Sequence, residues 1–237
     1  MKQLSELGEH PGHVWCAALD WESQTVVSGA EDGLLRVWRL EAPARPRRLE
    51  GHQADVWALA VDWGARRAVS GGRDGSLLCW DLGRCEPTRR LRGHSKDVLC
   101  VAASWARDRV ASGSADGSVR LWDVARGTCV AALAGGHDAV WSIGADSSLL
   151  RVLGGGRSGR LLLWHLEGRD AGPPEHELAP GSSPVAAVAL DAAGQRALSG
   201  HWDGSVVLWD LDERRALEAL RPTGSGRVEC LWVDWAT

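Results

Sequence analysis

Tryptophan returns at a fixed spacing along this chain of 237 residues. Trp38, Trp80, Trp122 and Trp164 are each 42 residues apart, and Trp209 follows 45 residues later. Each closes a similar segment, in order EDGLLRVW, RDGSLLCW, ADGSVRLW, RSGRLLLW and WDGSVVLW. Self-similarity with a period of about 40–45 residues indicates a repeat architecture of four-stranded units. The chain is therefore expected to consist of several copies of one small β unit.

Residues 93–123 show the unit in its most regular form. Apolar and polar residues alternate through VLCVAASW and again through RVASGS, which is the period of a half-buried strand and not of a helix. Asp116 and Gly117 separate the second of these runs from a third that ends at Trp122. An Asp-Gly pair favours a two-residue hairpin turn, because its two residues take positive backbone angles readily. The pattern predicts three antiparallel strands joined by tight turns.

The recurring Gly-His and Trp-Asp dipeptides resemble the signature of the WD40-repeat family, and the resemblance extends over nearly the whole chain. It implies an all-β fold, a WD40-type β-propeller, in a single domain over residues 1–237. Five complete four-stranded blades are expected. Their approximate bounds are 10–49, 52–91, 94–133, 136–178 and 181–220.

A sixth blade is expected to be incomplete. It would consist of an N-terminal strand within 2–8 and a C-terminal strand within 226–236, with the two strands between them missing. Trp232 also stands where the other copies have Ala18, Ala60, Ala102, Gly144 and Ala189, and it would overpack a regular blade interface. Two explanations remain open: the chain is truncated, or another chain fills the gap.

Composition argues against several classes of function. The net charge of −4 and the absence of a basic stripe do not favour a nucleic-acid partner. No apolar run is long enough for a membrane span, and MKQLSELGEH lacks the apolar core of a signal peptide. The six cysteines lack metal-ligand spacing, and the glycines form no phosphate-binding motif, so neither metal nor cofactor is expected. Unpaired cysteines favour a cytoplasmic or nuclear location.

His94, Ser112 and Asp116 invite comparison with a catalytic triad. The resemblance instead implies that they form, with Trp122, a buried hydrogen-bonded tetrad that braces the blade. A reaction centre would occur once, whereas this set recurs in the first two blades, so no catalytic residue is assigned. The equivalent sets are His10, Ser28, Asp32 and Trp38, and His52, Ser70, Asp74 and Trp80. Blades four and five lack parts of the set and are expected to be the least stable.

The resemblance also places ligand binding on one face of the propeller. That face is formed by the entries to the first strands and by the turns that precede each tetrad aspartate. The candidate contact residues are Trp15, Glu31, Asp55, Trp57, Arg73, Asp97, Leu99, Trp141, Arg157 and Trp202. Other entry positions hold His13, Ala139, Pro184, Ala186, Arg227 and Glu229. Trp and Arg are enriched in binding hot spots. The alternative is that Trp15, Trp57 and Trp141 simply pack between blades.

The expected function is a non-catalytic scaffold that binds a peptide or a partner protein on this Trp-rimmed face. One alternative is a substrate receptor of a ubiquitin ligase, although Arg126 lies one residue later than in the Trp-Asp-x-Arg pattern of such receptors. Another is a propeller hydrolase that would use Asp55 and Asp97 as a carboxylate pair. A larger complex, in which another chain completes the sixth blade, is one of the two explanations left open above; missing C-terminal strands are the other.

Overall fold

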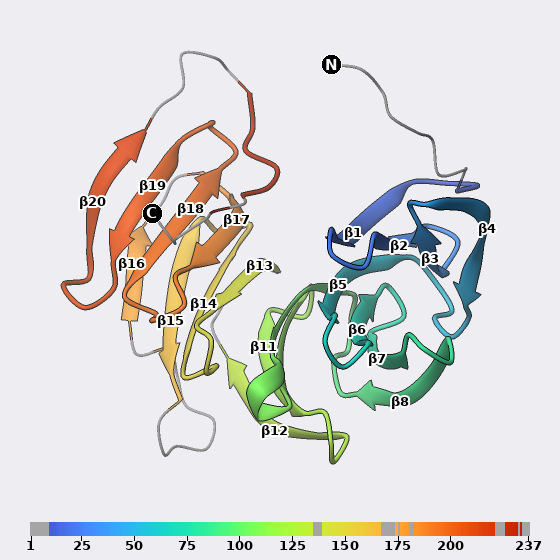
Figure 1. Cartoon of the computed structure of the whole chain (residues 1–237). Coiled ribbons are helices and arrows are strands. Elements are labelled where there is room, and N and C mark those ends of the chain that lie inside the picture. Colours follow the sequence, from blue (N-terminus) through green and yellow to red (C-terminus); the bar gives the residue numbers. More distant parts are fainter. Residues whose placement is uncertain are drawn as a thin grey trace. The chain divides into compact units, whose positions relative to one another are not determined.

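The computed structural model describes residues 10–134, 139–166, 174, 176–180, 183–220, 226–231 and 233. These residues fall into two compact units, Met1–Gly93 and His94–Thr237, which are described separately below. Nearly all regular structure is β (Figure 1). No helix in the described part of the chain is long and apolar enough to cross a membrane.

The two units contain five four-stranded antiparallel sheets, as the repeat predicted. In each sheet the strands are hydrogen-bonded in sequence order, so every sheet is a meander (Figure 1). The first unit holds two sheets. Their strands are β1 (Val14–Asp20), β2 (Thr25–Ala30), β3 (Leu35–Arg39) and β4 (Ala42–Leu49), then β5 (Val56–Asp62), β6 (Arg67–Gly72), β7 (Ser76–Asp81) and β8 (Glu86–Arg92).

The second unit holds the other three sheets. In the first of them a short 3-10 helix, Trp105–Arg107, joins β9 to β10. The strands are β9 (Val98–Ser104), β10 (Arg109–Ser114), β11 (Ser118–Asp123) and β12 (Thr128–Ala134); β13 (Val140–Ala145), β14 (Arg151–Gly156), β15 (Arg160–His165) and β16 (His176–Pro180); and β17 (Val185–Leu190), β18 (Arg196–His201), β19 (Val206–Asp210) and β20 (Arg215–Leu220).

The turn between β10 and β11 differs from the two-residue hairpin expected for Asp116-Gly117. Three residues, 115–117, connect the strands, and the Gly117 amide donates to the Ser114 carbonyl at 3.1 Å. Gly117 has φ 82°, whereas Asp116 is not in the positive-φ region. This is a three-residue loop in which only the last residue is left-handed. The geometry leaves the Asp116 carboxylate free to accept hydrogen bonds from the surrounding loop.

Neighbouring sheets dock through a valine on one sheet and a glycine on the next. Val140, at the start of β13, is fully buried against Gly113 in β10. A Cβ added at Gly113 would lie 2.6 Å from a Val140 methyl group and 2.6 Å from Cys100 Sγ. The same contact recurs within the units between Gly29 and Val56, Gly155 and Val185, and Gly200 and Val228.

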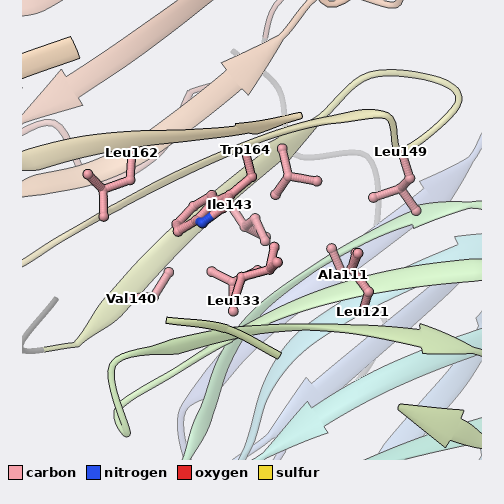
Figure 2. Close-up of a cluster of buried hydrophobic side chains, with 10 residues drawn as sticks. Ala111, Leu121, Leu133, Val140, Ile143, Leu149, Leu162 and Trp164 are labelled. Atoms are coloured by element: carbon pink, nitrogen blue, oxygen red, sulfur yellow. The ribbon is translucent and has the colours of Figure 1, made fainter. Parts of the chain in front are cut away.

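Each unit has an apolar core between its sheets. In the second unit, Leu121, Leu133, Ile143 and Trp164 are buried together between β11, β12, β13 and β15 (Figure 2). Trp164 is 2% exposed, and a Cβ at Gly154 would lie 3.0 Å from its ring. The large indole thus fills the space that the missing Gly154 side chain leaves.

The expected sixth blade is only partly described. Residues 2–8 and Trp232 lie outside the described residues, and 226–231 and 233 are not in a strand, contrary to the expected strand over 226–236. Val228 nevertheless occupies the docking position on Gly200, and its amide donates to the His201 carbonyl at 3.1 Å. At the other end, Val14 is 49% exposed, whereas its equivalents Val56 and Val140 are fully buried.

We predict that Gly113→Ala destabilises the protein by about 1–3 kcal/mol, because the methyl group would overpack the contact with Val140 and Cys100. The free energy of unfolding in urea measures the effect. Gly64→Ala is the control, since a Cβ there would meet its nearest atom at an ordinary 3.6 Å. Equal stabilities of the two variants would contradict the docking role of Gly113.

Candidate functional site

Ser112 is the centre of a buried hydrogen-bond network in the β9–β12 sheet. Its Oγ accepts a hydrogen bond from Trp122 Nε1 at 2.8 Å and lies 2.8 Å from His94 Nε2. His94 Nδ1 is 2.9 Å from an oxygen of Asp116. Because a carboxylate only accepts, Nδ1 carries the proton and Nε2 accepts from the serine hydroxyl. The predicted tetrad is therefore present, with all four polar groups paired.

The β5–β8 sheet repeats this arrangement. His52 Nε2 lies 2.7 Å from Ser70 Oγ, Trp80 Nε1 donates to the same oxygen at 2.8 Å, and His52 Nδ1 lies 3.1 Å from Asp74. Ser70 and Ser112 are both 0% exposed. A serine whose hydroxyl is enclosed and already committed to two partners is not placed to attack a substrate. The geometry is that of a brace within the sheet.

The surroundings of the tetrad shift the acidity of its members. Burial lowers the pKa of His94 below its usual value, against the opposing effect of Asp116. Burial raises the pKa of Asp116, but hydrogen bonds from Ser118, the Ser95 amide and His94 outweigh it and leave that pKa well below the usual range. The network thus holds a neutral imidazole beside an ionised carboxylate.

The β1–β4 sheet contains a modified network. Arg36, only 4% exposed, donates to both oxygens of Asp32 at 3.1 and 2.6 Å and to His10 Nδ1 at 2.8 Å. A guanidinium only donates, so His10 Nδ1 must accept and the imidazole proton must lie on Nε2, which donates to Ser28 Oγ at 2.8 Å. His10 is thus the opposite tautomer from His52 and His94. Burial and Arg36 both lower its pKa.

The β17–β20 sheet obtains its imidazole from a different place. Gly181 stands where the loop histidine is expected, and it lies outside the described residues. His201, at the end of β18, places Nε2 2.9 Å from Ser199 Oγ, which also accepts from Trp209 Nε1 at 2.8 Å. The equivalent residue in the β5–β8 sheet is Gly72, where an added Cβ would lie 2.6 Å from His52 Nδ1. His201 therefore enters the position of the missing ring, a role the sequence analysis did not assign to it.

The β13–β16 sheet is the most divergent. Gly154 replaces the serine, and Trp164 packs against it in the core. His137, which is one residue out of register in the sequence, lies outside the described residues.

The candidate contact face has a common backbone frame. In four sheets, the residue that follows the second strand donates its amide to the carbonyl of the residue before the first strand, at 2.8–3.0 Å. These pairs bring together the entry and turn positions that the sequence predicted. They are Glu31 with His13, Arg73 with Asp55, Ala115 with Asp97, and Trp202 with Pro184.

In the first unit, this face carries an aromatic cluster of His13, Trp15 and Trp57. The rings of His13 and Trp15 stack at 5.4 Å between centroids, and those of Trp15 and Trp57 lie 4.3 Å apart. Trp15 is 41% exposed, and the buried Nε1 of Trp57 makes no hydrogen bond within the described residues. The indoles of Trp15 and Trp57 thus contact each other between β1 and β5, and Trp15 keeps an exposed surface; the role of these residues in binding stays a prediction.

Charged groups border this first cluster. Glu31 accepts from the ring of His13 at 3.0 Å and from its amide at 3.1 Å, and these bonds lower the pKa of Glu31. Arg73 lies 3.6 Å from a carboxylate oxygen of Asp55, and its side chain is 61% exposed. The face therefore combines an aromatic surface with both signs of charge.

In the second unit, Trp141 and Trp202 stack with centroids 4.8 Å apart at an angle of 28°. The guanidinium of Arg227 lies 4.2 Å from the centre of the Trp202 ring. Arg227 and His13 occupy entry positions but were not among the candidate contact residues. Their place beside the aromatic rings could have been inferred from the residues that follow them, Val14 and Val228. A valine also begins the first strand of every other copy, so the residue before it lies at the entry position.

The remaining candidates are less closely associated. Asp55 belongs to the first unit and Asp97 to the second, and the carboxylate pair stays a prediction. Leu99 is half-buried in β9, and Arg157 is exposed after β14. Within the described residues, no three His, Cys, Asp or Glu side chains are grouped so that they could hold a metal ion.

We predict that His201→Ala costs about 1–3 kcal/mol of stability, because it removes one of the two partners of the buried Ser199 hydroxyl. His52→Ala should cost a similar amount, and Glu218→Ala, an exposed change on β20, should cost almost nothing. Urea unfolding provides the measurement. A neutral effect of His201→Ala would show that its ring does not substitute for the loop histidine.

The lowered pKa values of His10 and His94 also predict a pH dependence. Well above pH 6.5 both histidines are neutral in the folded and unfolded chains, and their contribution to stability is complete. As the pH falls below 6.5, the unfolded chain binds protons first, so stability is lost. Asp116 adds a loss below about pH 4, because the folded carboxyl group has the lower pKa.

Unfolding curves at pH 7.5, 6.5 and 5.5 test this expectation. The His94→Asn variant cannot titrate at this position and should lose less stability than the wild-type protein between pH 7.5 and 5.5. A wild-type protein that is equally stable at these pH values would contradict the assignment of neutral imidazoles.

Comparison with known proteins agrees with this geometry. The family model described as "WD domain, G-beta repeat" matches residues 1–39, 44–81, 85–123 and 172–210, which together make up more than half of the chain. The unmatched stretch after 123 contains most of the divergent β13–β16 sheet. A search of curated proteins gave no match. The matched repeats, the meander sheets and the serine-centred tetrads establish that this chain belongs to the WD40-repeat family.

Proposed function

We propose that the protein is a non-catalytic interaction scaffold that binds a peptide or a partner protein through the candidate contact face. WD40 propellers generally mediate protein interactions and are typically not enzymes. The observation that favours this face is the aromatic cluster of the first unit, in which Trp15 is 41% exposed beside charged Glu31 and Arg73.

Two physical arguments support the proposal. Exposed indoles held by stacking lose little conformational freedom on binding, and they contribute large contact areas at protein interfaces. The backbone bonds of Glu31 to His13 and of Arg73 to Asp55 also fix the surrounding loops before a partner arrives. A preformed surface of this kind reduces the cost of ordering on association.

Among the described residues, no observation specifically favours the ubiquitin-ligase receptor or the propeller hydrolase. Arg126 lies 3.6 Å from Asp123 within the turn after β11, and Arg84 forms a similar pair with Asp81 after β7. Because the pair recurs in two sheets, it is most simply explained as part of the turn and not as a ligase contact. The hydrolase alternative depends on Asp55 and Asp97, and these two residues belong to different units.

We predict that Trp15→Ala reduces capture of binding partners by about tenfold or more, as removal of a hot-spot tryptophan does. Arg73→Ala should reduce it to a smaller extent. The measurement is quantitative affinity capture with the purified full chain, with partners identified by mass spectrometry and binding repeated with each purified partner.

Trp21→Ala is the matched control, because Trp21 is 69% exposed at the other end of β1, away from the entry position. Partners retained by Trp21→Ala and lost with Trp15→Ala would support the proposal, provided that the unfolding midpoints of both variants match the wild type. Equal capture by the two variants would refute it.

A further inference from the structure

Blade five is unusual in carrying a tryptophan in the turn after its second strand. The equivalent residues of the other sheets are Glu31, Arg73, Ala115 and Arg157. The amide of Trp202 donates to Pro184 at 3.0 Å, in the same frame as the others, so only the side chain differs. The frame presents the indole at the contact face, where it stacks on Trp141 from β13. We call this pair the tryptophan platform.

A positive charge of the same chain already lies on this platform. The guanidinium of Arg227 is 4.2 Å from the centre of the Trp202 ring, which is within the range of a cation–π interaction. Arginine suits such a contact, because its guanidinium is planar and weakly hydrated. The side chain of Arg227 remains exposed to solvent.

Among the described residues, Val228 and Leu231 hold the segment that carries Arg227 against Gly200. Val228 packs its methyl group over Gly200 and donates its amide to the His201 carbonyl at 3.1 Å. The described residues 226–231 form no strand, and a Cβ at Gly226 would meet no atom within 4 Å. A segment outside the sheet hydrogen bonds opens at a low free-energy cost. The platform can therefore exchange its occupant without unfolding the sheet.

We propose that the tryptophan platform is a binding site for the guanidinium of an extended, arginine-bearing peptide segment of a partner protein. Arg227 occupies the site in the free chain and competes with that segment. The proposal rests on the function proposed above and adds the chemical class of the ligand. Because an internal occupant lowers the fraction of open sites, its removal should strengthen binding of an external arginine.

Fluorescence anisotropy with a labelled peptide tests this inference. The probe is Thr-Gly-Ser-Gly-Arg-Val-Glu, the sequence of residues 223–229, and the matched probe carries Gln in place of Arg. The full-length Arg227→Gln protein should bind the arginine peptide about threefold to tenfold more tightly than the wild type. The Arg227→Gln protein should also bind the glutamine peptide more weakly than the arginine peptide.

Two further variants make the result specific. Arg227→Gln combined with Trp202→Ala should lose the gain, and alanine is compatible with this turn because Ala115 occupies it in blade three. Arg126→Gln, which removes an exposed arginine from the turn after β11, should bind the probe like the wild type. Matching unfolding midpoints would show that all variants are folded.

Equal affinity of the wild type and Arg227→Gln for the arginine peptide would overturn the inference, as would equal affinity of Arg227→Gln for the two peptides. Absence of binding to every variant would overturn it as well. The capture experiment with Trp15→Ala is independent of these outcomes, because it tests the first unit. A positive capture with a negative peptide titration would therefore reject the arginine site and leave the scaffold function supported.

Discussion

A single buried serine hydroxyl holds the parts of each regular sheet in register. In four sheets, Oγ of Ser28, Ser70, Ser112 or Ser199 accepts the indole N–H of the third-strand tryptophan at 2.8 Å and meets an imidazole at 2.7–2.9 Å. The second strand is thereby tied to the third strand and, through the imidazole, to the segment or strand end that supplies it. A fully paired buried network of this kind is rigid, because every alternative leaves a polar group without a partner.

This rigidity explains why the backbone around each tetrad is the same from sheet to sheet while the side chains at the turn position differ. The imidazole and the aspartate order the loop before the first strand, and the amide–carbonyl bond beside them repeats at 2.8–3.0 Å in four sheets. That bond uses backbone atoms only. The side chain at the same position can therefore be Glu31, Arg73, Ala115 or Trp202 without loss of the frame. Recognition is expected to reside in these side chains, and the two aromatic clusters are the places where they gather.

Much of the fold could be predicted from the sequence, because the repeat samples the same physical problem several times. The 42-residue period predicted the repeated sheets, and the resemblance to the WD40-repeat family implied the contacts among His94, Ser112, Asp116 and Trp122. The resemblance also implied that the entry and turn positions lie together, and backbone hydrogen bonds join them in four sheets. The expected single domain over residues 1–237 stays a prediction.

Features that occur once could not be predicted in this way. Whether Arg36 points outward or into the network depends on the geometry of one sheet, so the inverted tautomer of His10 has no signal in the pattern. The imidazole of His201 comes from a position where another copy has glycine, and only coordinates show that the ring reaches Ser199. The stacking of Arg227 on Trp202 likewise joins residues of two different repeats.

The relocated imidazole of blade five restricts how such a repeat can change during evolution. The ring from the loop in the β5–β8 sheet and the ring from the strand end in the β17–β20 sheet both place Nε2 within 2.9 Å of the equivalent serine oxygen. A blade with both histidines would place two rings in a space that fits one, because a Cβ at Gly72 would already lie 2.6 Å from His52 Nδ1. A lineage that moves the histidine from one place to the other must pass through a crowded or an empty intermediate. Stable neighbouring blades would allow the chain to tolerate that step.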